Sequence, residues 1–196
     1  MTGNTYYDKR DFSKSPEPRG GSKKPGDQPI FVIQKHDAAN LHYDFRLEID
    51  GTLKSWSVPK GPSTNPRVRH MAIPTEDHPL EYADFEGVIP KGKYGGGTVM
   101  IWDRGTFENI KKDKRGQAIP LAESYKMGTV EVNLKGEKIM GGYALIRMNS
   151  GKMEGNWLLI KMHDEQADAR RNPVSTQTKS VFSGRSMKEI TKTGRS

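Results

Sequence analysis

The sequence predicts a mainly β protein, a small closed β-barrel with a few short flanking helices. Three observations lead to this fold class: many short segments alternate apolar and polar residues, turn-forming residues separate them, and helical periodicity is scarce. The clearest alternation covers residues 41–49, where apolar residues take the odd positions and His, Asp, Arg and Glu the even ones. Since side chains two apart on a strand share a face, this segment is predicted to be a strand with one apolar and one polar face.

Turn signals divide the rest of the chain into further short strands. Asp50-Gly51 is a strong hairpin signal, residues 37–40 are a plausible turn, and Lys135-Gly136 suggests another hairpin. Short helices are expected at 120–127 and 186–191. The predicted strands cover residues 31–36, 41–49, 53–58, 70–73, 98–102, 105–108, 129–134, 143–148 and 157–162.

The 196-residue chain is expected to form one barrel domain, residues 29–169, between two looser ends. Residues 1–28 are rich in Gly, Pro, Lys and Ser and are expected to form a flexible arm, and residues 170–196 a basic flexible tail. The net charge of +8 comes from these ends, because residues 29–169 hold nineteen basic and nineteen acidic residues. The charge alone fits a polyanionic partner and a solvated tail equally well.

Composition excludes several classes of protein. The absence of cysteine excludes disulfides and every cysteine-ligated zinc or iron–sulfur site. No apolar run approaches the ~18 residues that a membrane span needs, and the N-terminus lacks the apolar core of a signal peptide. We therefore expect a cytoplasmic protein with no membrane partner.

The polar face of the strand at 41–49 is a candidate metal and phosphate site. His42 and Asp44 are spaced about 6.5–7 Å apart on that face, which lets them close on one cation. His36 becomes a third ligand if the two neighbouring strands pair, and such a donor set suits Mn²⁺, Fe²⁺ or Zn²⁺. Arg46 adds a planar donor fork that matches a phosphate. From alternation alone, the solvated face of an ordinary strand explains these residues equally well.

Residues outside this strand add to the site. The loop Glu-Asp-His-Pro at 76–79 supplies His78, which can be a ligand, a general acid or a loop residue held by its acidic neighbours. Tyr82 can donate to a phosphate or be a half-buried aromatic residue, and Lys60 lies among turn residues where it can hold an anion. The glycine-rich stretch 93–97 precedes no helix and is expected to be only a tight entry to the next strand. Glu48 is expected to be the solvated end of its strand.

Five stretches resemble the 3′-phosphoesterase domain of bacterial DNA ligase D. They read FVIQKHDAANLHYDFRLE at 31–48, LKSWSVPKGP at 53–62, EDHPLEY at 76–82, WDRGTF at 102–107 and GNWLLIK at 155–161. The resemblance implies a small β-barrel with a Mn²⁺-dependent site that trims DNA 3′ ends during break repair. It also implies two reactions: removal of a terminal ribonucleoside to leave a 3′-phosphate, and removal of that phosphate to leave a 3′-hydroxyl.

The resemblance implies roles for individual residues. The residues matching metal ligands are His36, His42 and Asp44. Those matching phosphate contacts are Arg46 and His78, and Tyr82 matches an active-site tyrosine; either His78 or Tyr82 is expected to protonate the leaving oxygen. An N-terminal arm folds back over the site in the family, so further candidates are Arg10, Asp11 and Glu17, with Gln34 and Lys60 as secondary ones.

Position 70 departs from the family pattern. Family members have an active-site arginine before the strand Met71-Ala-Ile73, whereas this chain has His70 with Arg69 beside it. Either Arg69 substitutes through a small register shift, or one phosphate contact is weaker here. A weaker contact would affect the phosphomonoesterase step most, because binding of a dianionic 3′-phosphate depends more on positive charge.

The implied partners are DNA or DNA/RNA 3′ ends at primer–template junctions, together with a DNA ligase and a polymerase or primase, fused or separate. Two other classes of protein fit the same residues. A cupin-like iron oxygenase would use His42, Asp44 and a distant histidine as a facial triad, and a non-catalytic nucleic-acid-end binder would use the charged face only for phosphates. Arg46, Lys60 and the basic ends favour a phosphate over an oxidisable small molecule.

Overall fold

A computed structural model describes residues 5–194 of the chain, so residues 1–4 of the expected arm and 195–196 of the expected tail lie outside it. The described residues form a mainly β fold, which confirms the predicted class. The strands are β1 (Ile30–Asp37), β2 (Leu41–Ile49), β3 (Thr52–Val58), β4 (Arg69–Pro74), β5 (Gly87–Ile89), β6 (Gly97–Asn109), β7 (Thr129–Gly136), β8 (Met140–Arg147) and β9 (Trp157–Lys161). The helices are the 3₁₀ helix η1 (Leu80–Asp84), α1 (Leu121–Met127), α2 (Pro173–Thr176) and α3 (Met187–Thr193).

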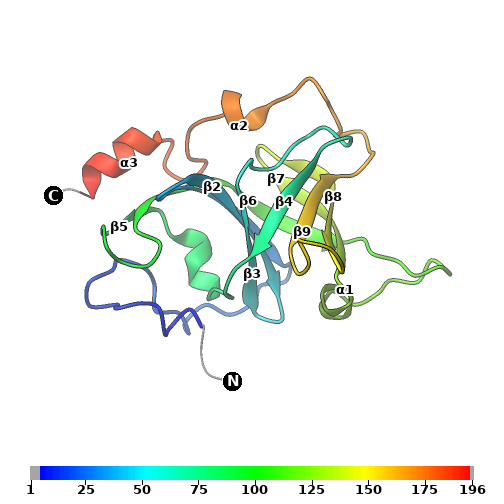
Figure 1. Ribbon diagram of the computed structural model, residues 1–196, viewed down its shortest axis with the longest axis horizontal. Helices are drawn as coiled ribbons and strands as arrows, with labels where there is room; N and C mark the ends of the chain where they lie inside the picture. The colour runs from blue at the N-terminus through cyan, green and yellow to red at the C-terminus, as the bar shows by residue number, and fades with distance from the viewer. Residues whose placement is uncertain (1–4, 195–196) are drawn as a thin grey trace.

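The sheet closes on itself. Its strand order is β1-β2-β3-β4-β9-β8-β7-β6, and β1 pairs again with β6, so eight antiparallel strands form a barrel. The short strand β5 lies outside this ring and pairs only with β6. In Figure 1 the barrel occupies the centre, with β5, α3 and the blue N-terminal segment gathered at one end of the molecule. Closure leaves the ring without a free edge, which is one way in which β proteins avoid edge-to-edge association.

Local signals explain the first two hairpins. β2 begins and ends at the predicted residues, and its alternation places Phe45 and Leu47 in the barrel interior. Asp50 and Gly51 both have positive φ, 53° and 74°, which is the geometry of the tight turn that connects β2 to β3. The same register pairs His36 with His42 across β1 and β2, as the candidate metal site requires.

The strand pattern differs from the prediction at β6. The predicted segments 98–102 and 105–108 belong to one strand of thirteen residues, which pairs with β1, β5 and β7. A register shift opposite Ile33 and Gln34 marks a β-bulge, which breaks the alternation and makes one strand look like two in the sequence. The short elements β5, η1 and α2 were not predicted, since three to five residues carry too little periodicity.

Two apolar clusters lie on opposite sides of the β1–β2 wall. The first fills the barrel with side chains from the ring strands, including Phe31, Trp102 and Trp157. The second lies outside the wall, where Val32, Ile101 and residues of η1 pack beneath Tyr6 of the N-terminal segment. The barrel interior is therefore packed core, and the chemistry-bearing residues of β2 lie on its outer, covered face.

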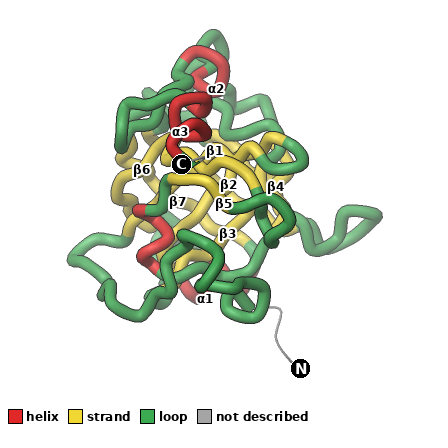
Figure 2. Tube along the Cα trace, turned by 90° about the vertical axis from the view of Figure 1, so that its left-hand side faces the viewer, coloured by secondary structure: helices red, strands yellow, loops and turns green. Residues whose placement is uncertain are grey.

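Residues after β9 pack on the barrel around a buried acidic side chain. Glu86 accepts hydrogen bonds from the backbone N–H of Ile101 and from the hydroxyls of Ser180 and Ser183. Ile190 of α3 is fully buried in the barrel cluster, and Ser186 caps α3 in a capping box with Glu189. Figures 1 and 2 both show α2 and α3 along the upper side of the strands, with α3 nearer to β5. Within residues 5–194, no helix is long and apolar enough to cross a membrane.

Candidate active site

A cavity of about 290 Å³ lies on the outer face of β1 and β2, beneath the N-terminal segment. The segment 5–28, the loop before η1 and the loop between β5 and β6 form its other walls. Its polar lining consists of Arg10, His36, His42, Asp44, Arg46, Ser57, Thr75, Glu76, His78, Tyr82 and Tyr94. The structure thus brings together in one cavity the three predicted metal ligands and four other predicted site residues.

Three ligand atoms converge at one end of this cavity. Among the described residues, His36, His42 and Asp44 form a group whose ligand atoms all lie within 4.8 Å of one another. The Nδ1 atom of His36 lies 3.4 Å from Oδ2 of Asp44, and Nε2 of His42 lies 3.5 Å from its Oδ1. Two imidazole nitrogens and a carboxylate suit a first-row transition metal such as Mn²⁺, Fe²⁺ or Zn²⁺.

The outer ring nitrogens of both histidines are held by backbone carbonyls. Nε2 of His36 lies 2.8 Å from the carbonyl oxygen of Gly95, and Nδ1 of His42 lies 2.8 Å from that of Asn40. Donation of these N–H groups leaves the opposite nitrogens with lone pairs directed at Asp44, and carbonyl partners of this kind orient metal-bound histidines. Lone pairs and a carboxylate this close to one another are stabilised by a cation between them, so the residues present fit a metal ion.

The Asp44 carboxyl is ionised in this setting. Burial alone raises its pKa, but the charge of the Arg46 guanidinium outweighs burial, so the pKa lies well below its usual range. The N-terminal half of β2 therefore presents a permanent negative charge to the two imidazoles.

Arg46 connects the metal group to the rest of the cavity. Its Nε donates to Gln34 Oε1 at 2.8 Å, one terminal nitrogen lies 3.0 Å from His78 Nδ1, and the other donates to Asp44 Oδ2 at 3.1 Å. A guanidinium has five N–H groups, and these contacts engage at most three of them, so at least two N–H groups are left for an anion. Its side chain is 3% exposed, so the contacts around it set its position.

His78 is a neutral imidazole between two cations. Its Nδ1 donates to the carbonyl oxygen of Glu76 at 2.9 Å and also faces Arg46, and its Nε2 lies 3.4 Å from a terminal nitrogen of Arg10, which can donate to it. Burial lowers its pKa, and Arg46 and Arg10 lower it further, to well below the ordinary value of 6.5. His78 consequently offers a hydrogen bond rather than a positive charge at neutral pH.

The His78 environment predicts acid sensitivity. As pH falls below about 6.5, unfolded chains bind a proton at residue 78 before folded ones do, so the free energy of unfolding decreases by up to about 1.4 kcal/mol per pH unit. Urea unfolding in chelator, between about pH 5 and pH 7, is expected to show a shallower pH slope for His78→Gln than for wild type. His163→Gln, at an exposed histidine, should keep the wild-type slope. Equal slopes for wild type and His78→Gln would contradict this account.

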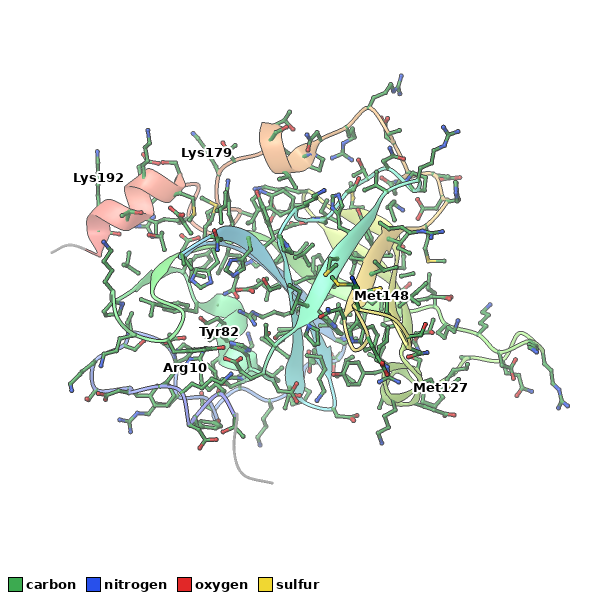
Figure 3. The ribbon with its side chains drawn as sticks, viewed as in Figure 1. Arg10, Tyr82, Met127, Met148, Lys179 and Lys192 are labelled. Atoms are coloured by element: carbon green, nitrogen blue, oxygen red, sulfur yellow. The ribbon has the colours of Figure 1, made fainter. Side chains whose placement is uncertain are left out.

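The N-terminal segment covers the cavity through Arg10. Its Nε donates to Glu17 Oε1 at 2.7 Å, and one terminal nitrogen donates to Glu76 Oε1 at 3.0 Å. The guanidinium also lies 4.0 Å from the ring centroid of Tyr6. The Tyr82 hydroxyl donates to the same Glu17 oxygen at 3.1 Å, and burial followed by the charge of Glu17 raises the pKa of Tyr82 well above 10. Figure 3 shows Arg10 and Tyr82 close together at this end.

The remaining predicted site residues lie around or outside the cavity. Gln34 is fully buried behind Arg46 and donates to the carbonyl oxygens of Tyr82 and Phe85, while Glu17 is buried behind Arg10. Asp11 is exposed and bonds to Ser13 on the outer surface of the segment. These three residues support the cavity walls or lie beyond them.

Position 70 also lies outside the cavity lining. His70 Nδ1 lies 2.6 Å from the carbonyl oxygen of Gly61, and Arg69 and Lys60 are exposed. The pairing of β4 with β9 is continuous from Arg69 to Ala72, so the side chains of residues 69 and 70 point to opposite faces. Without a register shift in β4, Arg69 does not take the place of an arginine at position 70.

The polar face of β2 is not solvated, contrary to one reading of its alternation. Every residue from Tyr43 to Ile49 is buried, because η1 and the N-terminal segment cover the even-numbered side chains. Glu48, expected at the solvated end of the strand, is 6% exposed and accepts the backbone N–H of Ile30 at 3.0 Å. Its role is to anchor the start of β1.

Four polar cavity residues had no predicted role: Ser57, Thr75, Glu76 and Tyr94. Glu76 binds both Lys9 and Arg10 of the N-terminal segment, and Tyr94 extends from the glycine-rich stretch that was read only as an entry to β6. The signal for Glu76 was its position two residues before His78. The signal for Tyr94 was an aromatic residue next to three glycines, in a stretch with no other apolar residue to pack against it.

Comparison with known proteins places this cavity in a family. The profile of the DNA ligase D 3′-phosphoesterase domain matches residues 34–147. The multifunctional non-homologous end joining protein LigD of Pseudomonas aeruginosa is 43% identical over 186 residues, covering 93% of this chain and 21% of that protein. Its counterparts in Mycobacterium tuberculosis and Mycolicibacterium smegmatis are 48% and 45% identical, covering 82% and 83% of this chain and 20% and 21% of theirs.

The chain therefore spans about a fifth of the length of these curated relatives. The matched region runs from Gln34 in β1 to Arg147 in β8 and contains all three metal-ligand candidates, together with Arg46, His78 and Tyr82. On the strength of this match, the chain belongs to the DNA ligase D 3′-phosphoesterase domain family.

Proposed function

We propose that this chain is a metal-dependent phosphoesterase that processes DNA 3′ ends for break repair. In the first reaction, water hydrolyses the bond between the phosphorus and the 5′ oxygen of the terminal ribonucleoside. The ribonucleoside leaves with a proton on its 5′ oxygen, and a 3′-phosphate remains on the strand. In the second, water converts that 3′-phosphate into a 3′-hydroxyl and inorganic phosphate. The observation that carries the proposal is a His-His-Asp ligand group beside two buried guanidinium groups in one cavity.

His36, His42 and Asp44 would hold the metal ion, and Mn²⁺ is the ion that the family resemblance favours. A divalent cation supplies Lewis-acid neutralisation of charge on a phosphate oxygen. His42 is the most exposed of the three ligands, with 20% of its side chain accessible, so the ligand group opens to solvent on that side.

The chain's own residues would bind and orient the phosphate. Arg46 and Arg10 both line the cavity, and the N–H groups that they do not use on Gln34, Asp44, Glu17, Glu76 and His78 would bind phosphate oxygens. These donors are preorganised by buried carboxylates and therefore need no rearrangement as negative charge develops. Thr75 lines the same cavity, and its buried hydroxyl has no hydrogen-bond partner among the described residues.

Guanidinium groups also separate this function from an iron oxygenase. Arg10 and Arg46 line the cavity together, and both select for an anionic substrate. A small oxidisable substrate without negative charge would offer these guanidinium groups no anionic partner beyond the carboxylates of Glu17, Glu76 and Asp44 that they already contact.

We also propose that the chain acts beside a DNA ligase and a polymerase or primase, fused to it or separate. The names of its relatives describe multifunctional end-joining proteins several times longer than this chain. Substrates would be DNA or DNA/RNA 3′ ends at primer–template junctions, with the basic residues near both ends of the chain in contact with strand phosphates.

The assay that tests this function uses a labelled duplex primer with one 3′-terminal ribonucleotide, incubated with Mn²⁺ or with chelator. We expect a 3′-phosphate product first and a 3′-hydroxyl product later, both absent with chelator. Binding without turnover, sensitive to salt and indifferent to chelator, would instead identify an end-binding module. Turnover dependent on iron and 2-oxoglutarate would identify an oxygenase.

A further inference from the structure

Tyr94 is an aromatic residue that the fold leaves open at the cavity. It lies in the loop between β5 and β6, it is 48% exposed, and it lines the cavity that holds the ligand group. By contrast, Tyr6, Tyr82 and Tyr143 are at most 3% exposed. A half-exposed aromatic ring at a polar site presents apolar surface on which a planar ligand can stack.

The ring of Tyr94 is held at its hydroxyl and by cations that lie over the ring. Its hydroxyl donates to Glu76 Oε2 at 3.3 Å and accepts from Lys9 Nζ at 3.2 Å. The Lys9 Nζ atom also lies 4.6 Å from the ring centroid, and the Arg10 guanidinium carbon lies 5.4 Å from it. Because these contacts already restrict the ring, a ligand that stacks on it loses little side-chain entropy.

The position of Tyr94 relates its ring to the reacting phosphate. Its neighbour Gly95 accepts the His36 Nε2 hydrogen bond, so the ring is one residue from a contact to a metal-ligand candidate. Lys91 is exposed beside it, and Lys93 lies 3.9 Å from Asp11 of the covering segment. A phosphate at the ligand group would thus carry its nucleoside toward a ring flanked by cations, which is the composition of a single-strand stacking platform.

We infer that Tyr94 stacks on a nucleobase adjacent to the scissile phosphate and thereby determines how the 3′ end is seated. The inference rests on the proposed 3′-end processing. It assigns Tyr94 to substrate binding through its ring, with the hydroxyl serving only to hold the ring in place. The platform recognises any base by its π face, so it selects for an intact base without reading its identity.

The test compares Tyr94→Ala and Tyr94→Phe on primers that carry an intact base or no base at the terminal or the penultimate position. For Tyr94→Ala we expect KM on the intact primer to rise about 5- to 150-fold, the range of one base–aromatic stack, with kcat changed far less. Removing the base at the stacked position should raise the wild-type KM similarly and abolish the difference between wild type and Tyr94→Ala. Tyr94→Phe should stay within about threefold of wild type.

Controls separate this role from a structural one. Mn²⁺ affinity of Tyr94→Ala should equal that of wild type, and Phe182→Ala, at another exposed aromatic, should leave KM unchanged. Equal KM increases for Tyr94→Ala and Tyr94→Phe would overturn the inference, because the hydroxyl contacts to Lys9 and Glu76 would then be what matters. A Tyr94→Ala effect that persists on primers lacking the base at either position would also overturn it.

Binding of the same primers, measured by fluorescence anisotropy in chelator, distinguishes the two proposals. If turnover is absent but wild type binds base-containing ends more tightly than Tyr94→Ala does, the platform stands and the proposed reaction fails. If turnover is normal and Tyr94→Ala binds and reacts like wild type, the reaction stands and the platform fails.

Discussion

His42→Ala is expected to reduce both phosphoesterase activities by at least about 10³-fold. Loss of one of three ligands removes the bound metal. Neutralisation of phosphate charge by a metal stabilises the transition state by several kcal/mol, and about 4 kcal/mol corresponds to a 10³-fold change in rate. The fold should survive, because His42 is partly exposed and its contact within the chain outside the ligand group is the Asn40 carbonyl. Mn²⁺ affinity by calorimetry and turnover on primers ending in a ribonucleotide or a 3′-phosphate measure the two consequences.

The matched control for this variant is His163→Ala. His163 is an exposed histidine outside the cavity, so its loss changes the histidine content without changing the ligand group. It should retain wild-type Mn²⁺ affinity and both activities. Wild-type turnover by His42→Ala with Mn²⁺ would show that the ligand group is wrongly assigned.

Arg46→Ala should damage both catalysis and stability. The variant leaves the ionised Asp44 carboxyl and the Gln34 amide oxygen without their guanidinium donor, and losing one partner of a buried ion pair costs about 3–5 kcal/mol. The same change removes the two N–H groups proposed to bind phosphate, for which we expect at least a 10²-fold loss of kcat, about 2.7 kcal/mol. Urea unfolding in chelator and single-turnover kinetics measure the two effects separately.

Arg46→Lys distinguishes charge from geometry at the same position. A lysine keeps the positive charge. Its single nitrogen, however, cannot replace the three guanidinium nitrogens that contact Gln34, His78 and Asp44. We expect it to recover part of the stability and little of the activity. Arg170→Lys, at an arginine whose side chain is 92% exposed, should change neither. Full activity in Arg46→Lys would show that charge alone suffices.

Alternation and turn chemistry predicted the barrel because both are local. A period of two over residues 41–49 identifies β2 and separates its core face from its polar face, and Asp50-Gly51 specifies the hairpin that follows. The pairing of His36 with His42 then follows from the short turn between β1 and β2. The ligand group could thus be predicted from fourteen consecutive positions, residues 31–44, with no knowledge of distant contacts.

The walls of the cavity could not be predicted in this way, because they are made by residues far apart in the chain. Arg10 meets His78 across 68 positions, Lys9 meets Tyr94 across 85, and the position of Glu17 against Tyr82 spans 65. No periodicity relates such pairs, since their meeting depends on the return of the N-terminal segment over η1 and on β5 pairing outside the barrel.

The sequence by itself therefore determined the fold class, the β2 polar face and the identity of its three candidate ligands, because each depends on spacing along a strand. Only the tertiary structure decided that this face is covered rather than solvated, that Glu48 anchors β1, and that His70 lies outside the cavity. In that covered space the charge of Arg46 lowers the pKa of Asp44 against the effect of burial, whereas burial, Arg46 and Arg10 together lower the pKa of His78. Strand spacing brings the ligands together, and long-range packing turns their surroundings into a site for an anion.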